Sequence, residues 1–150
     1  MADVIKQLNY GSIVTVLSTE LNSLTNNSRA ISAAQGADGT AADLLGDFEL
    51  VVTYGANPTA ESTIDLYLVR SADGTNYEDG DGSIRPAPDA FVGSFPVRAV
   101  TTAQRIVLRD RPLPPGLWKA LLHNNATGQT FASSGNTLKL RPHNRQVVTV

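Results

Sequence analysis

The chain has 150 residues and a mass of 15.9 kDa, which suits one domain with a single covered core. Its net charge of −2 gives no overall attraction to nucleic acid or to anionic membranes. It contains no cysteine, so disulfides, thiolate nucleophiles and cysteine-ligated metal sites are excluded. No apolar run approaches the roughly 18 residues of a membrane span, and the first residues lack a signal-peptide pattern. We therefore expect a soluble protein that is synthesised in a cytoplasm.

Residues 1–43 give no single clear pattern. Residues 12–17 favour a β-strand, whereas the leucines at positions 17, 21 and 24 have the spacing of a short helix behind a possible cap at Ser18. Residues 33–42 are rich in alanine and glycine and predict a loop. The sequence leaves open whether this segment is an N-terminal arm or supplies the first strands.

From residue 44 onward, short apolar segments alternate with turns rich in Gly, Pro, Asn and Asp, which is typical of antiparallel β-structure. Residues 47–54 and 63–69 predict a hairpin, and the second of these is apolar on both faces, as in a central strand. The prolines of residues 112–116 predict a stiff corner. Further strands are expected at residues 90–97, 104–108, 117–122 with Trp118 in the core, and 137–141. We predict an all-β, antiparallel two-sheet β-sandwich over residues 44–150, as a jelly-roll or another Greek key.

Charge is distributed unevenly along the chain. Residues 1–75 hold 3 basic and 9 acidic side chains, whereas residues 97–150 hold 8 basic and 1 acidic. These basic residues either pair with acidic residues on neighbouring strands, such as Asp43, Asp47, Glu49 and Asp65, or form a face that docks on an acidic partner. The arginines that we expect at a subunit interface are Arg98, Arg105, Arg109, Arg111, Arg141 and Arg145.

We find no motif that predicts catalysis or a resident metal. The histidines, His123 and His143, lack a partner at the spacing of a helical metal site, and no nucleophile elbow or phosphate-binding loop occurs. An acidic loop could hold a weak cation but fits solvated turn residues better, because it lacks the ligand alternation of a calcium loop. Its members are Asp73, Glu78, Asp79 and Asp81. We expect no enzyme activity, no cofactor and no metal.

Aromatic side chains could mark a sugar-binding face if they were exposed. The candidates are Tyr54, Tyr67, Tyr77 and Trp118. Three of them fall in apolar strand patterns, which indicates core positions, and only Tyr77, in a long loop, is expected to be exposed.

Several segments, in their order along the chain, resemble a family of small virion structural proteins of tailed bacteriophages. They are DFELVVTY (47–54), LYLV (66–69) followed by DGTNY (73–77), VGSFPVRAV (92–100), PLPPG (112–116) and SGNTL (134–138). The resemblance implies a non-enzymatic virion component, a capsid decoration or cement protein that binds the major capsid protein on the outer shell as a homo-oligomer, a dimer or a trimer. The alternative is a tail, neck or fibre module that binds carbohydrate or a receptor. Neither alternative involves nucleic acid or a membrane.

Overall fold

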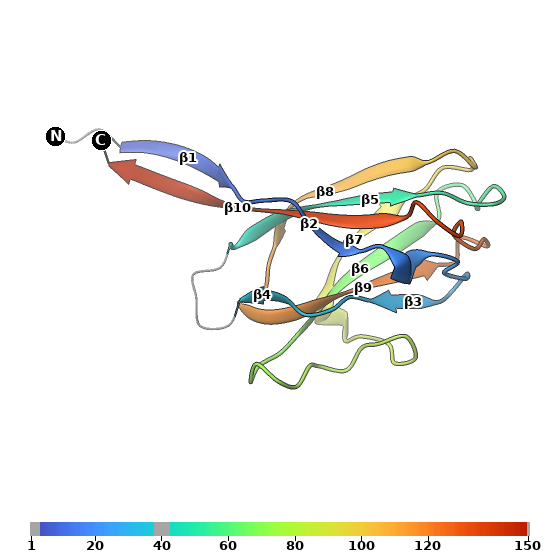
Figure 1. The fold of residues 1–150 in the computed structure, drawn as a ribbon, viewed down its shortest axis with the longest axis horizontal. Helices are drawn as coiled ribbons and strands as arrows, with labels where there is room; N and C mark the ends of the chain where they lie inside the picture. Colours follow the sequence, from blue (N-terminus) through green and yellow to red (C-terminus); the bar gives the residue numbers. More distant parts are fainter. Residues whose placement is uncertain (1–3, 38–42, 150) are drawn as a thin grey trace.

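The computed structural model describes the backbone of residues 4–37 and 43–149, and the side chains of residues 9–36 and 43–144. Two antiparallel sheets face each other across one core (Figure 1). Sheet A has the order β1-β10-β5-β8, with β2 also on β10, and sheet B has the order β3-β9-β6-β7, with β4 also on β9. Sheet A contains β1 (Val4–Tyr10), β2 (Val14–Leu17), β5 (Leu45–Val52), β8 (Gln104–Pro112) and β10 (Thr137–Thr149). Sheet B contains β3 (Arg29–Ile31), β4 (Gln35–Ala37), β6 (Thr63–Arg70), β7 (Phe91–Pro96) and β9 (Gly116–Asn125).

The predicted β-sandwich is confirmed, and its topology is a jelly-roll. β1 and β2 both pair with β10, so they act as two halves of one edge strand, and β3 and β4 do the same on β9. Counted in this way, each sheet has four strands, and the chain passes to the other sheet at every connection except the one from β6 to β7, which is the double Greek-key order. The proline-rich corner that the sequence predicts joins the end of β8 to the start of β9. None of the helices among the described residues is long and apolar enough to cross a membrane.

The hairpin expected from residues 47–54 and 63–69 is wrong. These segments form β5 and β6, which lie in opposite sheets: β5 pairs with β10 and β8, whereas β6 pairs with β9 and β7. The break at residues 55–62 carries the chain from one sheet to the other instead of turning it back on itself. Both segments are nevertheless central strands, as the apolar pattern of the second one indicated.

The core lies between the sheets. Along β5 the burial alternates strictly, with Phe48, Leu50 and Val52 fully buried and their neighbours only partly covered. Trp118 of β9 is buried and meets Phe48 edge-on, with ring centroids 6.4 Å apart, which joins the two sheets. Burying such side chains contributes about 1.5–3 kcal/mol each, so this layer is the main source of stability.

Residues 71–90, which we call the covering loop, pack on the outer face of sheet B. A second cluster of buried side chains forms there, with Tyr77 of the loop packed against it. In Figure 1 the covering loop, in yellow-green, lies below sheet B and away from sheet A. It ends in a short 3-10 helix, η2 (Pro88–Ala90). The members of the cluster are Tyr67, Val69, Ala90 and Leu121.

The first segment of the chain supplies edge strands of both sheets. The β-prone residues 12–17 contain β2, and the leucine spacing that favours a short helix coincides with the 3-10 turn that follows, η1 (Thr19–Leu21). Leu17, Leu21 and Leu24 are all buried in the core. The expected loop at 33–42 contains β4, and its residues 38–42 lie outside the described part of the chain. β1 and the end of β10 form a two-stranded ribbon that projects beyond the sandwich (Figure 1).

Candidate functional site

Among the described residues, no loop packs over the outer face of sheet A, which is hollowed into a groove of about 370 Å³ that we call the sheet A groove. Its floor consists of outward-facing side chains of three adjacent strands, β5, β8 and β10. Along β5, strict alternation places Asp47 and Glu49 outward because their neighbours point into the core. The lining residues are Ile13, Asp47, Glu49, Arg105, Val107, Lys139, Leu140 and Arg141.

The strand register places acidic and basic side chains beside each other across the groove. Lys139 of β10 lies opposite Glu49 of β5, and Arg141 lies opposite Asp47. Glu49 is bound by Arg105 of β8, with 2.6 Å between the guanidinium and the carboxylate. Within the described residues, Lys139 has no hydrogen-bond or ion-pair partner. The groove therefore offers hydrogen-bond donors and acceptors side by side.

Tyr10 lies next to the groove, at the root of the ribbon. Its ring stacks on the Arg141 guanidinium, with 4.5 Å from Cζ to the ring centroid, and it stays 45% exposed. The apolar side chains of Ile13 and Val107, 62% and 39% exposed, lie on the groove itself. The site thus combines charged groups with exposed apolar and aromatic surface.

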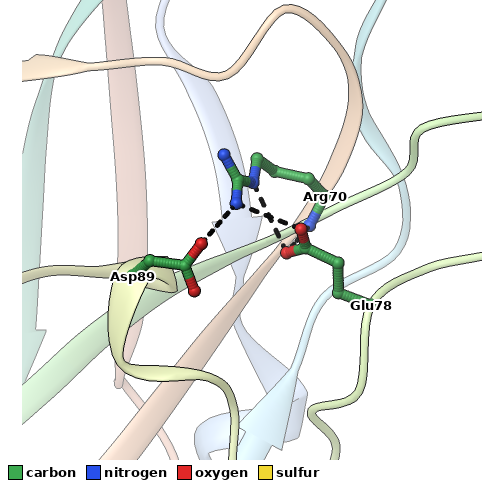
Figure 2. A network of polar contacts seen from close by, with 3 residues as sticks. All are labelled: Arg70, Glu78 and Asp89. Atoms are coloured by element: carbon green, nitrogen blue, oxygen red, sulfur yellow. Dashed lines mark hydrogen bonds and ion pairs between the residues drawn. The ribbon is translucent and has the colours of Figure 1, made fainter.

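A second hollow, of about 290 Å³, lies beside η2 and the start of β7. Its polar groups are already engaged: the Arg70 guanidinium contacts Glu78 at 3.1 Å and Asp89 at 2.8 Å (Figure 2). The hydrogen bond to Glu78 is the main reason that the pKa of Arg70 is raised above its ordinary value. Because Glu78 and Asp89 belong to the covering loop, this network fastens both parts of the loop to the end of β6. We therefore favour the sheet A groove as the ligand site.

The acidic loop consists of turn residues within the covering loop. Asp73 accepts hydrogen bonds from the Asn76 side chain and from the backbone N–H groups of Asn76 and Thr75. These bonds, with the Asn76 side chain first, hold the pKa of Asp73 well below its ordinary value. Asp81 accepts from the backbone N–H groups of Ser83 and Ile84 in the same manner. Both carboxylates thus stabilise their own turns.

The six arginines expected at an interface do not share one face. Arg105 and Arg141 line the sheet A groove. Arg109 is exposed on β8, and Arg98 is exposed in the loop after β7. The Arg111 guanidinium lies near Gly93, between β8 and β7. Arg145 pairs with Leu8 in the ribbon, and its side chain lies outside the described part of the structure.

The aromatic residues that face solvent are ones that the sequence did not single out. Tyr54 and Trp118 are buried, as expected for core positions, and Tyr77 is partly covered against Lys119. Tyr10 and Phe91 are instead 45% and 47% exposed. A register shift opposite β6 turns Phe91 outward. Leu66 pairs with Gly93, and the next residue of β6, Tyr67, pairs with Phe91, so Val92 is the extra residue of a bulge in β7. No local signal in the sequence marks this bulge.

Comparison with known proteins finds no matching family model and no matching curated protein. The chain is similar to two solved structures, among others. One is the CBM36-1 domain of a multidomain xylanase from the hindgut metagenome of Trinervitermes trinervoides, with 12% identity and a TM-score of 0.49, covering 91% of this chain and 96% of that chain. The other is a family 6 carbohydrate-binding module from Clostridium cellulolyticum in complex with xylose, with 13% identity and a TM-score of 0.40, covering 93% and 96%.

These findings contradict the expected role as a capsid decoration or cement protein. The two solved structures named above are carbohydrate-binding modules and not phage proteins. The physical reason for the error is that strand patterns and turn motifs report the fold, and one sandwich scaffold carries many unrelated functions. The segments on which the resemblance rests lie in β5, β6, β7 and the start of β10, in the Asp73 turn and in the proline corner, all of which build the scaffold.

Proposed function

We propose that this chain is a non-enzymatic glycan-binding module that holds an oligosaccharide in the sheet A groove. The observation that carries the proposal is the row of paired carboxylate, guanidinium and ammonium groups on an uncovered sheet face. A sugar hydroxyl both donates and accepts hydrogen bonds, so it can use Asp47 and Glu49 as acceptors and Arg105 and Lys139 as donors. Ile13, Val107 and the edge of Tyr10 supply apolar contact for the C–H faces of a sugar ring.

The charge of the groove favours a polyhydroxyl ligand over a polyanion. Its lining has three basic and two acidic side chains, and Arg105 is neutralised by Glu49. A nucleic acid would meet the two carboxylates on the same floor, which repels phosphate. Binding without chemistry is the simpler hypothesis, because open, solvent-exposed polar groups suit hydrogen bonding to hydroxyls.

The resemblance to virion proteins of tailed phages remains a prediction. Combined with the glycan-binding proposal, it favours the alternative of a tail or fibre module that contacts bacterial surface glycans. Assembly with other virion subunits and homo-oligomer formation remain predictions as well. A bound glycan would gain affinity from repeated copies of the module, since multivalency raises the effective concentration.

The test is binding of the full chain to a glycan array, followed by titration calorimetry with the oligosaccharides that bind. We expect Lys139→Ala to weaken binding at least about 10-fold, since it removes a charged hydrogen-bond donor. Lys119→Ala is the matched control, because Lys119 lies on the opposite sheet under the covering loop. The bound oligosaccharide should be recovered intact after prolonged incubation.

Three results would contradict the proposal. The first is an absence of binding across the array. The second is an equal loss in both lysine variants. The third is a loss on Phe91→Ala with none on Lys139→Ala, which would move the site to the second hollow.

A further inference from the structure

Three metal-ligating side chains meet at the end of the sheet A groove that faces the ribbon. They are Asp47 of β5, Asp110 of β8 and His143 of β10, from three adjacent strands. Between Gly46 and Phe48 the register with β8 shifts by one residue, so two residues of β8 lie opposite Asp47. This bulge brings Asp110 onto the outer face with the other two side chains.

The spacing of these groups fits a cation better than it fits direct hydrogen bonds. Nε2 of His143 lies 3.3 Å from Oδ1 of Asp47 and 3.4 Å from Oδ1 of Asp110, and all three ligand atoms lie within 4.8 Å of one another. Two ligands at about 2.1 Å from a tetrahedral cation lie about 3.4 Å apart. A charge-assisted hydrogen bond would instead be about 2.7–2.9 Å long.

The burial and charge of the cluster also call for a cation. The His143 side chain is only 1% exposed, and its Nε2 points at both carboxylates. A neutral imidazole has one N–H and therefore cannot satisfy both. Within the described residues, neither Asp47 nor Asp110 forms an ion pair with a lysine or an arginine, since Arg141, opposite Asp47, stacks on Tyr10. The two carboxylates thus share a site without a lysine or arginine bound to either, and a divalent ion would supply the balancing positive charge.

We infer that Asp47, Asp110 and His143 bind a divalent transition-metal cation, with Zn²⁺ as the natural probe. One imidazole nitrogen and two carboxylate oxygens are a donor set that such ions accept, whereas Mg²⁺ prefers oxygen ligands alone. The Asp110 side chain is 67% exposed, so the coordination shell stays open on the outer side. Water or a ligand oxygen would complete it there. This inference stands independently of glycan binding, because it requires no sugar.

The experiment uses the full chain after chelator treatment, titrated with Zn²⁺ by calorimetry and followed by thermal melting without any glycan. We expect one Zn²⁺ per chain and a rise in Tm with Zn²⁺ concentration, because the ion binds the folded state. Mg²⁺ should leave the Tm unchanged. Asp110→Asn should weaken Zn²⁺ binding at least about 10-fold without unfolding the chain, because asparagine tolerates the left-handed backbone of this position, where φ is 53°.

Two control variants keep the inference falsifiable. Asp79→Asn removes an exposed aspartate of the covering loop, and His123→Gln removes the other histidine; both should bind Zn²⁺ as the unmodified chain does. The inference is overturned if Zn²⁺ gives neither heat nor a Tm shift, if Mg²⁺ acts equally, or if His123→Gln loses binding while Asp110→Asn keeps it.

Discussion

The outer faces of the two sheets differ in how far their side chains are buried. Along β5 of sheet A every second residue is buried, whereas along β6 of sheet B six consecutive residues are buried. Both strands are central, so the difference comes from the covering loop, which packs on sheet B and leaves sheet A open. A face that buries apolar side chains serves stability, and a face that keeps charged side chains in solvent is available to a ligand.

The largest expected effect comes from opening the covered face. Leu121→Ala removes a fully buried side chain that packs with Tyr67 and Val69 beneath the covering loop. We expect it to lower the free energy of unfolding by about 2–5 kcal/mol, because it leaves a cavity. Val107→Ala on the open face of sheet A should change it by less than about 0.5 kcal/mol. Urea unfolding of both variants measures the contrast, and equal losses would show that the covering loop does not seal sheet B.

A smaller effect on the free energy of unfolding is expected for substitutions in the covering loop. Tyr77 packs on the second cluster, and Nζ of Lys119 lies 4.3 Å from its ring centroid. Tyr77→Ala should cost about 1 kcal/mol, the sum of lost packing and a cation–π contact of about 0.5–1 kcal/mol. Tyr77→Phe keeps the ring and should cost much less, as measured by urea unfolding. A similar loss in both variants would indicate that the hydroxyl, and not the ring, holds the loop.

The covered face should also respond to pH through His123. Burial, and then the nearby Arg29, lower the pKa of His123 below its ordinary value of 6.5. The unfolded chain therefore takes up a proton at a higher pH than the folded chain. The resulting stability is present above the unfolded pKa and is lost as pH falls through it toward the folded pKa. Thermal melting between about pH 7 and pH 5 should show a decline that His123→Gln reduces, and an identical decline in both proteins would contradict this assignment.

The sequence predicts the scaffold well, because its strands are marked locally. Alternating apolar residues and the turn-forming dipeptides locate most strands from β5 to β10, and three prolines mark the corner before β9. The pairing of β5 with β10 and β8 was missed, because partners such as Leu50 and Leu138 are far apart along the chain. Proximity in sequence favoured a hairpin, whereas packing of apolar faces against each other favoured the crossing between sheets.

The candidate site could be predicted only in part. The arginines at 105 and 141 were singled out by charge, but nothing local shows that they share a groove with Glu49. The cluster of Asp47, Asp110 and His143 has no signature in the sequence, because its only histidine has no second histidine at helical spacing. Asp110 and His143 follow Asp47 by 63 and 96 positions, and the three side chains meet only through strand register and one bulge.

The smallest expected effect lies on the open face, at the pair formed by Glu49 and Arg105. Their charged atoms are 2.6 Å apart, but the Arg105 side chain is 64% exposed, so solvent screens the attraction. A double-mutant cycle with Glu49→Gln and Arg105→Gln should give a coupling of about 0.2–1 kcal/mol in urea unfolding. Added salt should reduce it further. A coupling above about 2 kcal/mol would mean that the pair holds sheet A together, which would weaken the case that the groove keeps its polar groups for a ligand.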